Sequence, residues 1–381
     1  MDMEVEPSSP LKRFGIKNSI QTNFGDDYVF QIDSNHDNST LAVSLSTNSI
    51  KLYSPVTGQY IGECTGHSAP INQISFSAPS NPNLLNSCSS DGTIRAWDIR
   101  SFNQVSLWNA GSLQEVFSFS FGGSSDNLLA AGCKTEVLIW DWRKGKRIAC
   151  LEESHVEDVT QVHFSPDYRN KLISASVDGL ICKFDTEGNI NDDDHLESVM
   201  NVGTSIAKIG FCGNMNSKLW CMTHIETLSI WDWKEGINEA NIEDARTLAS
   251  DSWTLDHVDY FVDCHYSGED DRLYVIGGTN AGSLGYFPIN YGQGSRPSIG
   301  SPGAILEGGH VGVVRTVLPM SSSYGGRASN QGGIFGWTGG EDGRLCCWLS
   351  DDTCEVNRSW ISNGLVIKPV KSIKKSRHQP Y

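Results

Sequence analysis

Short apolar stretches separated by turn residues recur along most of the chain. In the segment from Gly66 to Arg100, an alternating run at Ile71–Phe76 is followed by an apolar run at Leu84–Cys88 and by a third run that ends at Trp97. The turn Ser90-Asp91-Gly92 separates the second and third runs, and glycine suits a backbone position with positive φ. Runs of this length with turn chemistry between them predict three short antiparallel strands.

The third run ends in an aromatic residue, and similar aromatics recur along the chain at a regular period. They are Tyr53, Trp97, Trp140, Phe184, Trp231, Phe287 and Trp348, and the successive spacings are 44, 43, 44, 47, 56 and 61 residues. One such unit cannot bury both of its faces alone, so neighbouring units must stack. The pattern predicts seven stacked units. We attribute the wider late spacings to loop-rich insertions at 291–303 and 321–333.

Polar residues at fixed places in some units predict a buried hydrogen-bonded network, here called the relay. In the second unit, the Trp97 indole is expected to donate to Ser87, Ser87 to bond to His67, and His67 to bond to Asp91. The seventh unit has the complete set, whereas the fourth has phenylalanine in place of tryptophan. The residues of the seventh unit are His310, Thr338, Asp342 and Trp348, and those of the fourth are His155, Ser174, Asp178 and Phe184. The third, fifth and sixth units lack the set, so we expect them to depend on packing and to open locally more easily.

The Gly-His pair, the serine ten residues before the tryptophan, the aspartate six residues before it and the Trp-Asp pair together resemble the repeat of the WD-repeat family. The resemblance implies an all-β fold, a single seven-bladed β-propeller in which each unit is one blade. Residues 17–22 precede the first blade as residues 60–64 precede the second. We therefore expect them to form the outer strand of blade 7 and to close the ring. The predicted organisation is a disordered N-terminal arm at 1–16, the propeller at 17–360 and a basic C-terminal tail at 361–381.

The relay also has the residue types of a hydrolase, namely a nucleophile, a base and an orienting carboxylate. The structural interpretation accounts for them better, because the set recurs in blade 7 with threonine as the hydroxyl and because the tryptophan uses the hydroxyl's hydrogen-bonding capacity. The glycine-rich stretch at 277–282 is typical of a hairpin and not of a phosphate loop, since no helix is expected after it. We predict a protein that is not an enzyme and needs no cofactor or metal.

The net charge of −16 is unevenly distributed. Residues 364–381 carry five Lys or Arg and no acid, so the rest of the chain carries −21. An acidic body disfavours binding to nucleic acid except through the basic tail. That tail is alternatively a nuclear-import signal, a contact for an acidic partner or a solvated terminus. Near the other end, Ser9-Pro10 resembles a site for a proline-directed kinase.

The cysteine content and the hydropathy of the chain indicate where in the cell the protein is expected. Eleven cysteines without a C-x-x-C pair, many of them in predicted strands, fit the reduced thiols of an intracellular protein. No apolar run approaches the length of a membrane span, and the acidic start lacks the features of a secretory signal. We expect a monomeric propeller in the nucleus or the cytoplasm, with proteins or peptides as partners and no contact with membranes.

A propeller brings the loop before each first strand and the turn before each third strand to one face around its channel. Aromatic residues with a few charges at such a face predict a site for partners. By alignment with blade 2, the predicted partner-binding residues are Tyr28, Phe30, Asn72, Glu115, Phe117, Asp158, Tyr260 and Arg315. The alternative is that Phe30 and Phe117 only pack between blades.

Two blades end in a Trp-Asp-x-Arg sequence: 97–100 in blade 2 and 140–143 in blade 3. These sequences resemble the box by which propellers that serve as substrate receptors dock to the adaptor of cullin-type ubiquitin ligases. The resemblance implies that Arg100 and Arg143 bind an adaptor, on the face opposite the aromatic set. The alternative is that these are ordinary surface cations, since basic residues commonly follow a Trp-Asp pair.

Four stretches in blades 4 to 7 resemble one subfamily of WD-repeat proteins, WD repeat-containing protein 89. They are residues 154–162, 220–224, 273–280, and 308–310 followed by 338–342. The resemblance implies a non-enzymatic scaffold and supplies no partner. The predicted function is a protein-interaction scaffold in a multiprotein assembly. The alternatives are a substrate receptor of a cullin-type ubiquitin ligase and a scaffold in ribosome biogenesis.

Overall fold

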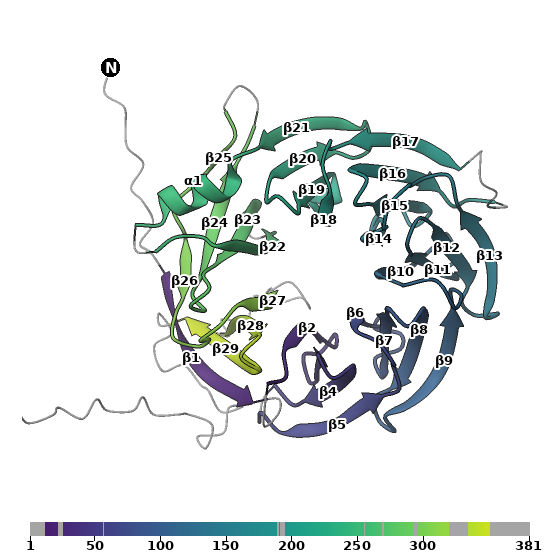
Figure 1. Ribbon diagram of the computed structural model, residues 1–381, viewed down its shortest axis with the longest axis horizontal. Coiled ribbons are helices and arrows are strands. Elements are labelled where there is room, and N and C mark those ends of the chain that lie inside the picture. The colour runs from purple at the N-terminus through teal and green to yellow at the C-terminus, as the bar shows by residue number, and fades with distance from the viewer. Residues whose placement is uncertain are drawn as a thin grey trace, which may run out of the picture.

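The computed structural model describes residues 12–21, 26–55, 57–188, 190, 195–254, 256–268, 270–292, 296–319 and 334–350. In these residues the fold is a β-propeller, with seven antiparallel blades arranged around a central axis (Figure 1). The predicted fold class is therefore confirmed. The predictions for the arm at residues 1–11, which include Ser9, for the insertion at 321–333, for residues 351–360 and for the basic tail at 361–381 lie outside the described residues.

Five blades are separate four-stranded sheets in chain order. Blade 1 contains β2 (Val29–Ser34), β3 (Leu41–Leu45), β4 (Ser49–Tyr53) and β5 (Tyr60–Thr65). Blade 2 contains β6 (Ile71–Phe76), β7 (Leu84–Ser89), β8 (Thr93–Asp98) and β9 (Asn103–Asn109). Blade 3 contains β10 (Ser118–Gly122), β11 (Leu128–Gly132), β12 (Val137–Asp141) and β13 (Lys146–Leu151). Blade 4 contains β14 (Gln161–Phe164), β15 (Lys171–Ala175), β16 (Leu180–Asp185) and β17 (Leu196–Asn201). Blade 5 contains β18 (Ile206–Cys212), β19 (Lys218–Thr223), β20 (Leu228–Asp232) and β21 (Ile237–Ile242), with the 3-10 turn η2 (Asn214–Asn216).

Blades 6 and 7 are joined in one larger sheet. Blade 6 contains β22 (Tyr260–Ser267), β23 (Arg272–Gly278), β24 (Leu284–Asn290), β25 (Ser298–Ile299) and β26 (Ala304–Leu306). Blade 7 contains β27 (Val314–Pro319), β28 (Ile334–Gly340) and β29 (Arg344–Ser350). The first strand of each blade lies nearest the axis (Figure 1). All seven aromatics that defined the period lie in the third strands, from Tyr53 at the end of β4 to Trp348 in β29.

The N-terminal strand β1 (Lys12–Gln21) lies at the outer edge of blade 7. It pairs antiparallel with β29 from Phe14 to Gln21, and its first residues, Lys12 to Phe14, pair parallel with β26 of blade 6. The strand therefore begins at Lys12 and not at Lys17, so the segment assigned to the arm enters the sheet earlier than expected. The reason is the added partner, because β26 offers backbone groups that a blade-by-blade alignment does not include. One strand thus connects the outer edges of the last two blades.

A short helix, α1 (Ala245–Ser252), lies between β21 and β22 on the outside of blade 6 (Figure 1). It explains the spacing of 56 residues between Trp231 and Phe287, so the attribution of that spacing to a loop insertion is wrong. The helix buries only Ala245 and Ala249. Such a narrow apolar face is a weak periodic signal. Within the described residues, no helix is long and apolar enough to cross a membrane.

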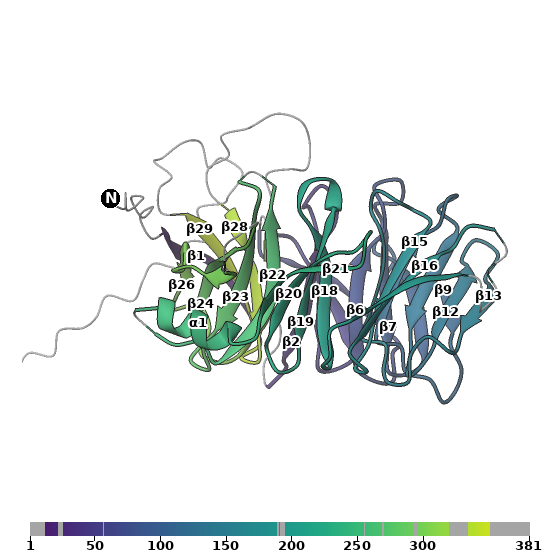
Figure 2. The same ribbon diagram turned by 90° about the horizontal axis from the view of Figure 1, so that it is seen from above.

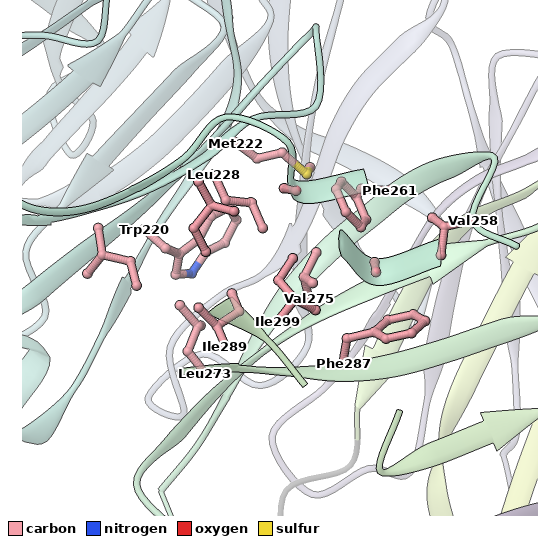
Figure 3. Packing of buried hydrophobic residues seen from close by; sticks show 14 of the residues in the cluster. Trp220, Met222, Leu228, Val258, Phe261, Leu273, Val275, Phe287, Ile289 and Ile299 are labelled. Carbon is pink, nitrogen blue, oxygen red and sulfur yellow. The ribbon is translucent and has the colours of Figure 1, made fainter. Parts of the chain in front are cut away.

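The hydrophobic core is divided among the blade junctions, and each of the seven clusters of described residues lies between two neighbouring blades. The largest joins blades 5 and 6, and it contains Trp220 and Leu228 of blade 5 with Leu273 and Phe287 of blade 6 (Figure 3). Blade 5 lacks the relay. Its stability therefore comes in large part from this packing, since a buried large side chain contributes about 1.5–3 kcal/mol.

Side chains of the inner strands also connect each blade to the next by a hydrogen bond to the neighbour's backbone, at 2.7–3.3 Å. The links run from Gln31 to Ile74, Gln73 to Phe119, Ser118 to Val162, Thr160 to Ile206, Lys208 to Val262, Tyr260 to Val314 and Thr316 to Ile32. Every junction has one. Because the first-strand backbone of the next blade has no other sheet partner on that side, these bonds satisfy groups that would otherwise remain unpaired.

The two ends of the disc carry different loops (Figure 2). We call the end with the loops before the first strands and the turns before the third strands the relay face. The other end, with the connections that follow the first and third strands, is called the opposite face. Helix α1 connects the relay-face ends of β21 and β22.

Candidate functional site

The structure brings the four relay residues of blade 2 together. The indole Nε1 of Trp97 donates to Ser87 Oγ at 2.8 Å, and Ser87 Oγ lies 2.8 Å from His67 Nε2. The other ring nitrogen, His67 Nδ1, lies 2.9 Å from Asp91 Oδ2. Because the indole N–H can only donate, the consistent arrangement is Ser87 O–H donating to Nε2 and Nδ1–H donating to the carboxylate.

The electrostatics agree with a neutral imidazole beside a carboxylate. Burial lowers the pKa of His67, and the hydrogen bond that its ring donates to Asp91 offsets this only in part. Burial also acts to raise the pKa of Asp91, but hydrogen bonds from Thr93, His67 and the Ser68 amide outweigh it, so the pKa of that carboxyl is lowered. The relay is therefore an uncharged donor chain that ends on one ionised acid.

Blades 4 and 7 repeat this geometry. His155 lies 2.7 Å from Ser174 Oγ and 3.0 Å from Asp178, and Phe184 supplies no donor. In blade 7 the corresponding contacts of His310 are 2.8 Å to Thr338 and 3.0 Å to Asp342, and Trp348 Nε1 donates to Thr338 at 2.7 Å.

The relay aspartate also binds the loop that follows its histidine. The backbone amides of Ser68, Val156 and Val311 donate to Asp91, Asp178 and Asp342 at 3.1, 3.1 and 2.9 Å. Each carboxylate therefore holds both the histidine ring and the next residue of the loop. The relay fixes the position of one loop tip on the relay face in each of the three blades.

Blades without the relay connect the same loop and turn by other contacts. In blade 5, Ser205 Oγ bonds to His224 Nδ1 at 2.7 Å, and in blade 6 the Asn280 amide donates to Asp259 at 2.7 Å. In blade 3, Lys134 pairs with Glu115 at 3.4 Å. These contacts supplement the packing on which we expect these blades to depend. Their contacts are exposed, so each contributes less than a buried relay.

The hydroxyl of the relay is not available to a substrate. Ser87 is fully buried, and its oxygen already contacts the Trp97 indole and the His67 ring. Attack on a carbonyl needs an accessible oxygen and an adjacent oxyanion site. The geometry therefore supports a structural role for the relay.

The predicted partner-binding residues all lie at the relay face, but the structure uses them differently. Tyr28 and Phe30 are exposed by 40% and 36%, and their rings form an edge-to-face pair with centroids 6.5 Å apart. Asn72 Nδ2 instead donates to Val116 O of blade 3 at 2.8 Å, and the Tyr260 hydroxyl accepts the Val314 amide at 2.7 Å. Polar groups of Asn72 and Tyr260 therefore serve the blade junctions.

The charged members of the predicted set are mostly paired within the protein. Arg315 Nε donates to Glu341 Oε1 at 2.8 Å, and Glu115 pairs with Lys134. Phe117 and Asp158 are half-buried. Tyr28 and Phe30 are thus the exposed aromatic part of the predicted set.

Sequence reasoning missed a group of aliphatic side chains at the tips of the relay-face loops. They are Leu113, Val156, Ile225 and Val311, exposed by 85%, 78%, 67% and 66%. Two of them follow a relay histidine directly, and the corresponding residue in blade 2 is serine. A Gly-His-Val or Ser-His-Val sequence at the start of a blade was therefore the available signal.

The two Trp-Asp-x-Arg sequences lie on the opposite face and differ in construction. Arg100 folds back on Asp98, with Nε to Oδ1 at 3.0 Å and Nη2 to Oδ2 at 2.7 Å, and these bonds lower the pKa of Asp98 to about 2. Arg143 instead lies over the Trp142 ring, 5.3 Å from its centroid, and donates to Asp126 O at 3.3 Å. Arg100 therefore has an ion-pair partner, whereas Arg143 is oriented by an aromatic ring.

Trp142 has a structural role that the box does not predict. Its indole donates to the carbonyl of Asp126, a residue with a left-handed φ of 50°. In blade 5, Trp233 donates in the same way to Asn216, whose φ is 46°. The second tryptophan of the Trp-Asp-Trp sequence thus stabilises a strained turn after the first strand.

Among the described residues, one group of metal-ligand types gathers, namely Glu136, Cys150 and Glu152, with ligand atoms within 4.8 Å of one another. Cys150 Sγ donates to Glu136 at 3.6 Å. Burial, helped by the two acids, raises the pKa of Cys150 to about 12. In this arrangement the thiol serves as a hydrogen-bond donor to a carboxylate.

The fold and the relay define a WD-repeat propeller, and comparison with known proteins supports this class. The family WD domain, G-beta repeat matches residues 58–98 and 145–185. The chain belongs to the WD-repeat family. It is 66% identical over 392 residues to WD repeat-containing protein GTS1 of Arabidopsis thaliana, covering 100% of this chain and 98% of the relative.

Two further relatives bear on the predictions. WD repeat-containing protein 89 homolog of Dictyostelium discoideum is 33% identical over 295 residues, covering 77% of this chain and 78% of the relative. The predicted resemblance to that subfamily is confirmed. DDB1- and CUL4-associated factor 10 of Homo sapiens is 25% identical over 162 residues, covering 42% of this chain and 28% of the relative.

Proposed function

We propose that this protein is a non-enzymatic scaffold, inside the cell, whose relay face binds segments of partner proteins. The propeller is a protein-interaction fold, and WD-repeat propellers are generally scaffolds without catalytic activity. The observation that carries the proposed binding role of the relay face is the exposure of Val156 and Val311 on loops that the buried relay holds in place. Fixed apolar anchors lose little conformational entropy on binding, which favours affinity.

Affinity purification from native extract followed by mass spectrometry tests this proposal. The wild type is compared with a relay-face variant, Phe30→Ala/Val311→Ser, and with an opposite-face variant, Arg100→Glu/Arg143→Glu. We expect the relay-face variant to lose the main co-purifying proteins and the opposite-face variant to retain them. Identical partner lists for the wild type and the relay-face variant would contradict the proposal.

A second candidate function is a substrate receptor of a cullin-type ubiquitin ligase. It is favoured by two cations at equivalent positions of adjacent blades on the opposite face, and by the similarity of part of the chain to a protein named as associated with DDB1 and CUL4. In this role Arg100 and Arg143 bind the adaptor while the relay face holds the substrate.

The same purification tests the second candidate, since its critical residues lie on the other face. Adaptor and cullin peptides are expected with the wild type and with the relay-face variant, and they should disappear from the Arg100→Glu/Arg143→Glu sample. If no adaptor peptide is recovered with the wild type, or if the double variant retains it, the receptor function is excluded.

A further inference from the structure

Acidic residues are concentrated on the relay face. Its loops and turns, residues 26–28, 46–48, 66–70, 90–92, 111–117, 134–136, 152–160, 177–179, 202–207, 224–226, 243–254, 256–260, 280–282, 307–313 and 341–343, contain nineteen Asp or Glu and two Lys or Arg. The described connections of the opposite face contain seven acids and six Lys or Arg. The relay face is therefore strongly acidic, whereas the described connections of the opposite face are nearly neutral.

Part of this acidity has an internal function. Asp91, Asp178 and Asp342 hold the relay, and Glu341 and Glu115 pair with cations of the protein. Another part is concentrated in the loop that leads from blade 3 into blade 4. That loop carries Glu152, Glu153, Glu157 and Asp158 within a stretch that has no Lys or Arg.

The same loop displays an apolar side chain in a fixed position. Val156 is exposed, and its amide is held by Asp178, which in turn binds His155. Glu157 and Asp158 follow it directly. The Val311 loop of blade 7 is built in the same way, and Glu341, which pairs with Arg315, donates its amide to Val313 O of this loop. An apolar anchor beside carboxylates suits a partner that combines aliphatic and cationic groups.

We propose that the relay face binds a linear segment rich in Lys and Arg that also carries large aliphatic side chains. This deepens the proposed scaffold function and rests on it. The acids select for positive charge and accelerate association, while Val156, Val311 and the other loop tips contact the aliphatic groups. Nucleic acid is disfavoured as an occupant, because its phosphates would meet the same carboxylates.

Fluorescence polarisation with three labelled peptides of about twelve residues tests the proposal on the full chain. One alternates lysine and leucine, one lysine and serine, and one glutamate and leucine. We expect the lysine–leucine peptide to bind at least about tenfold more tightly than the lysine–serine peptide, with an affinity that falls as salt rises. The glutamate–leucine peptide should not bind.

Matched charge reversals assign the site. Glu157→Lys/Asp158→Lys should weaken lysine–leucine binding at least about fivefold, and Val156→Ser/Val311→Ser should weaken it by a similar factor. The control Glu187→Lys/Glu235→Lys makes the same change in net charge on the opposite face and should alter binding by less than about twofold. Equal weakening by the control would overturn the proposal, as would equal binding of the lysine–leucine and glutamate–leucine peptides.

The basic-segment proposal can fail while the scaffold proposal stands, because the two are tested by different experiments. If the relay-face variant loses its partners from native extract but the wild type does not prefer the lysine–leucine peptide, the scaffold function stands and the basic-segment proposal fails. If neither partners nor peptide respond to relay-face substitutions, both fail.

Discussion

The phenolic oxygen of Tyr260 in blade 6 accepts a hydrogen bond from the backbone amide of Val314 in blade 7, at 2.7 Å. This contact is one of the seven inner-strand links between neighbouring blades. It also shows how a residue whose position suggests a surface role can serve the ring itself.

Tyr260→Phe removes the acceptor and leaves the buried Val314 amide without its partner. An unsatisfied buried amide costs about 1–3 kcal/mol, so the free energy of unfolding should fall by that amount. Hydrogen exchange of the Val314 amide should become faster, because it reports opening of the blade 6–blade 7 junction. Tyr28→Phe is the control, since its ring is exposed, and it should change neither quantity.

Two substitutions in the relay of blade 2 should reduce the free energy of unfolding by different amounts. Trp97→Phe keeps most of the packing but removes the donor to Ser87, and we expect it to reduce the free energy of unfolding by about 1–2 kcal/mol. His67→Ala should cost more, about 3–5 kcal/mol, because it leaves a cavity and deprives both Ser87 and Asp91 of a partner. Urea denaturation of the two variants measures both effects. An equal cost for the two would contradict the relay as a connected network.

Asp33 should make the free energy of unfolding fall as pH rises, which is the reverse of the usual effect of a carboxyl group. Burial raises the pKa of Asp33 to about 6 despite hydrogen bonds from the amides of Phe76 and Ser34. Asp33 therefore binds a proton more tightly in the folded protein than in the unfolded chain, where the pKa of its carboxyl is the ordinary 3.8. This contribution is fully present below pH 3.8 and is lost as pH rises through 6.

The test for Asp33 compares the wild type with Asp33→Asn in urea at several pH values between 4 and 8. The difference in unfolding free energy between the two should change across this range, with Asp33→Asn gaining relative to the wild type as pH rises. A difference that does not depend on pH would show that Asp33 titrates at its ordinary value.

Truncation of Trp142 should destabilise the protein and truncation of Arg100 should not, although both belong to Trp-Asp-x-Arg sequences. Trp142→Ala removes the indole donor to Asp126 and an edge-to-face contact with Phe121, and should reduce the free energy of unfolding by about 2–3 kcal/mol. Arg100→Ala should leave the thermal midpoint unchanged, because its pairing with Asp98 is exposed to solvent. Differential scanning calorimetry of the two variants measures both effects.

Much of the fold could be predicted because its signals are local. Trp97, Ser87 and Asp91 lie at fixed separations within one blade, so a single repeat reveals both the strands and the hydrogen bonds among them. The partnership of Tyr260 with Val314 depends on how two blades stand beside each other. No spacing within a blade encodes that relationship, and so Asn72 and Tyr260 were assigned to the partner face from their positions alone.

The remaining misses have similar physical causes. Helix α1 buries only two alanines, which hydrophobic periodicity detects poorly. The start of β1 is set by pairing with β26, a partner from another blade. The exposed loop tips such as Val156 were visible in the sequence, but their fixed position depends on Asp178 more than twenty residues away.

Zero-length carbodiimide cross-linking in native extract tests the central claim most directly, because it joins carboxylates of this protein to lysines of whatever is bound. The account predicts intermolecular cross-links at Glu157 and Asp158 on the relay face and few at Glu187 and Glu235 on the opposite face. Cross-links that fall mainly on the opposite face, or equally on both, would contradict it.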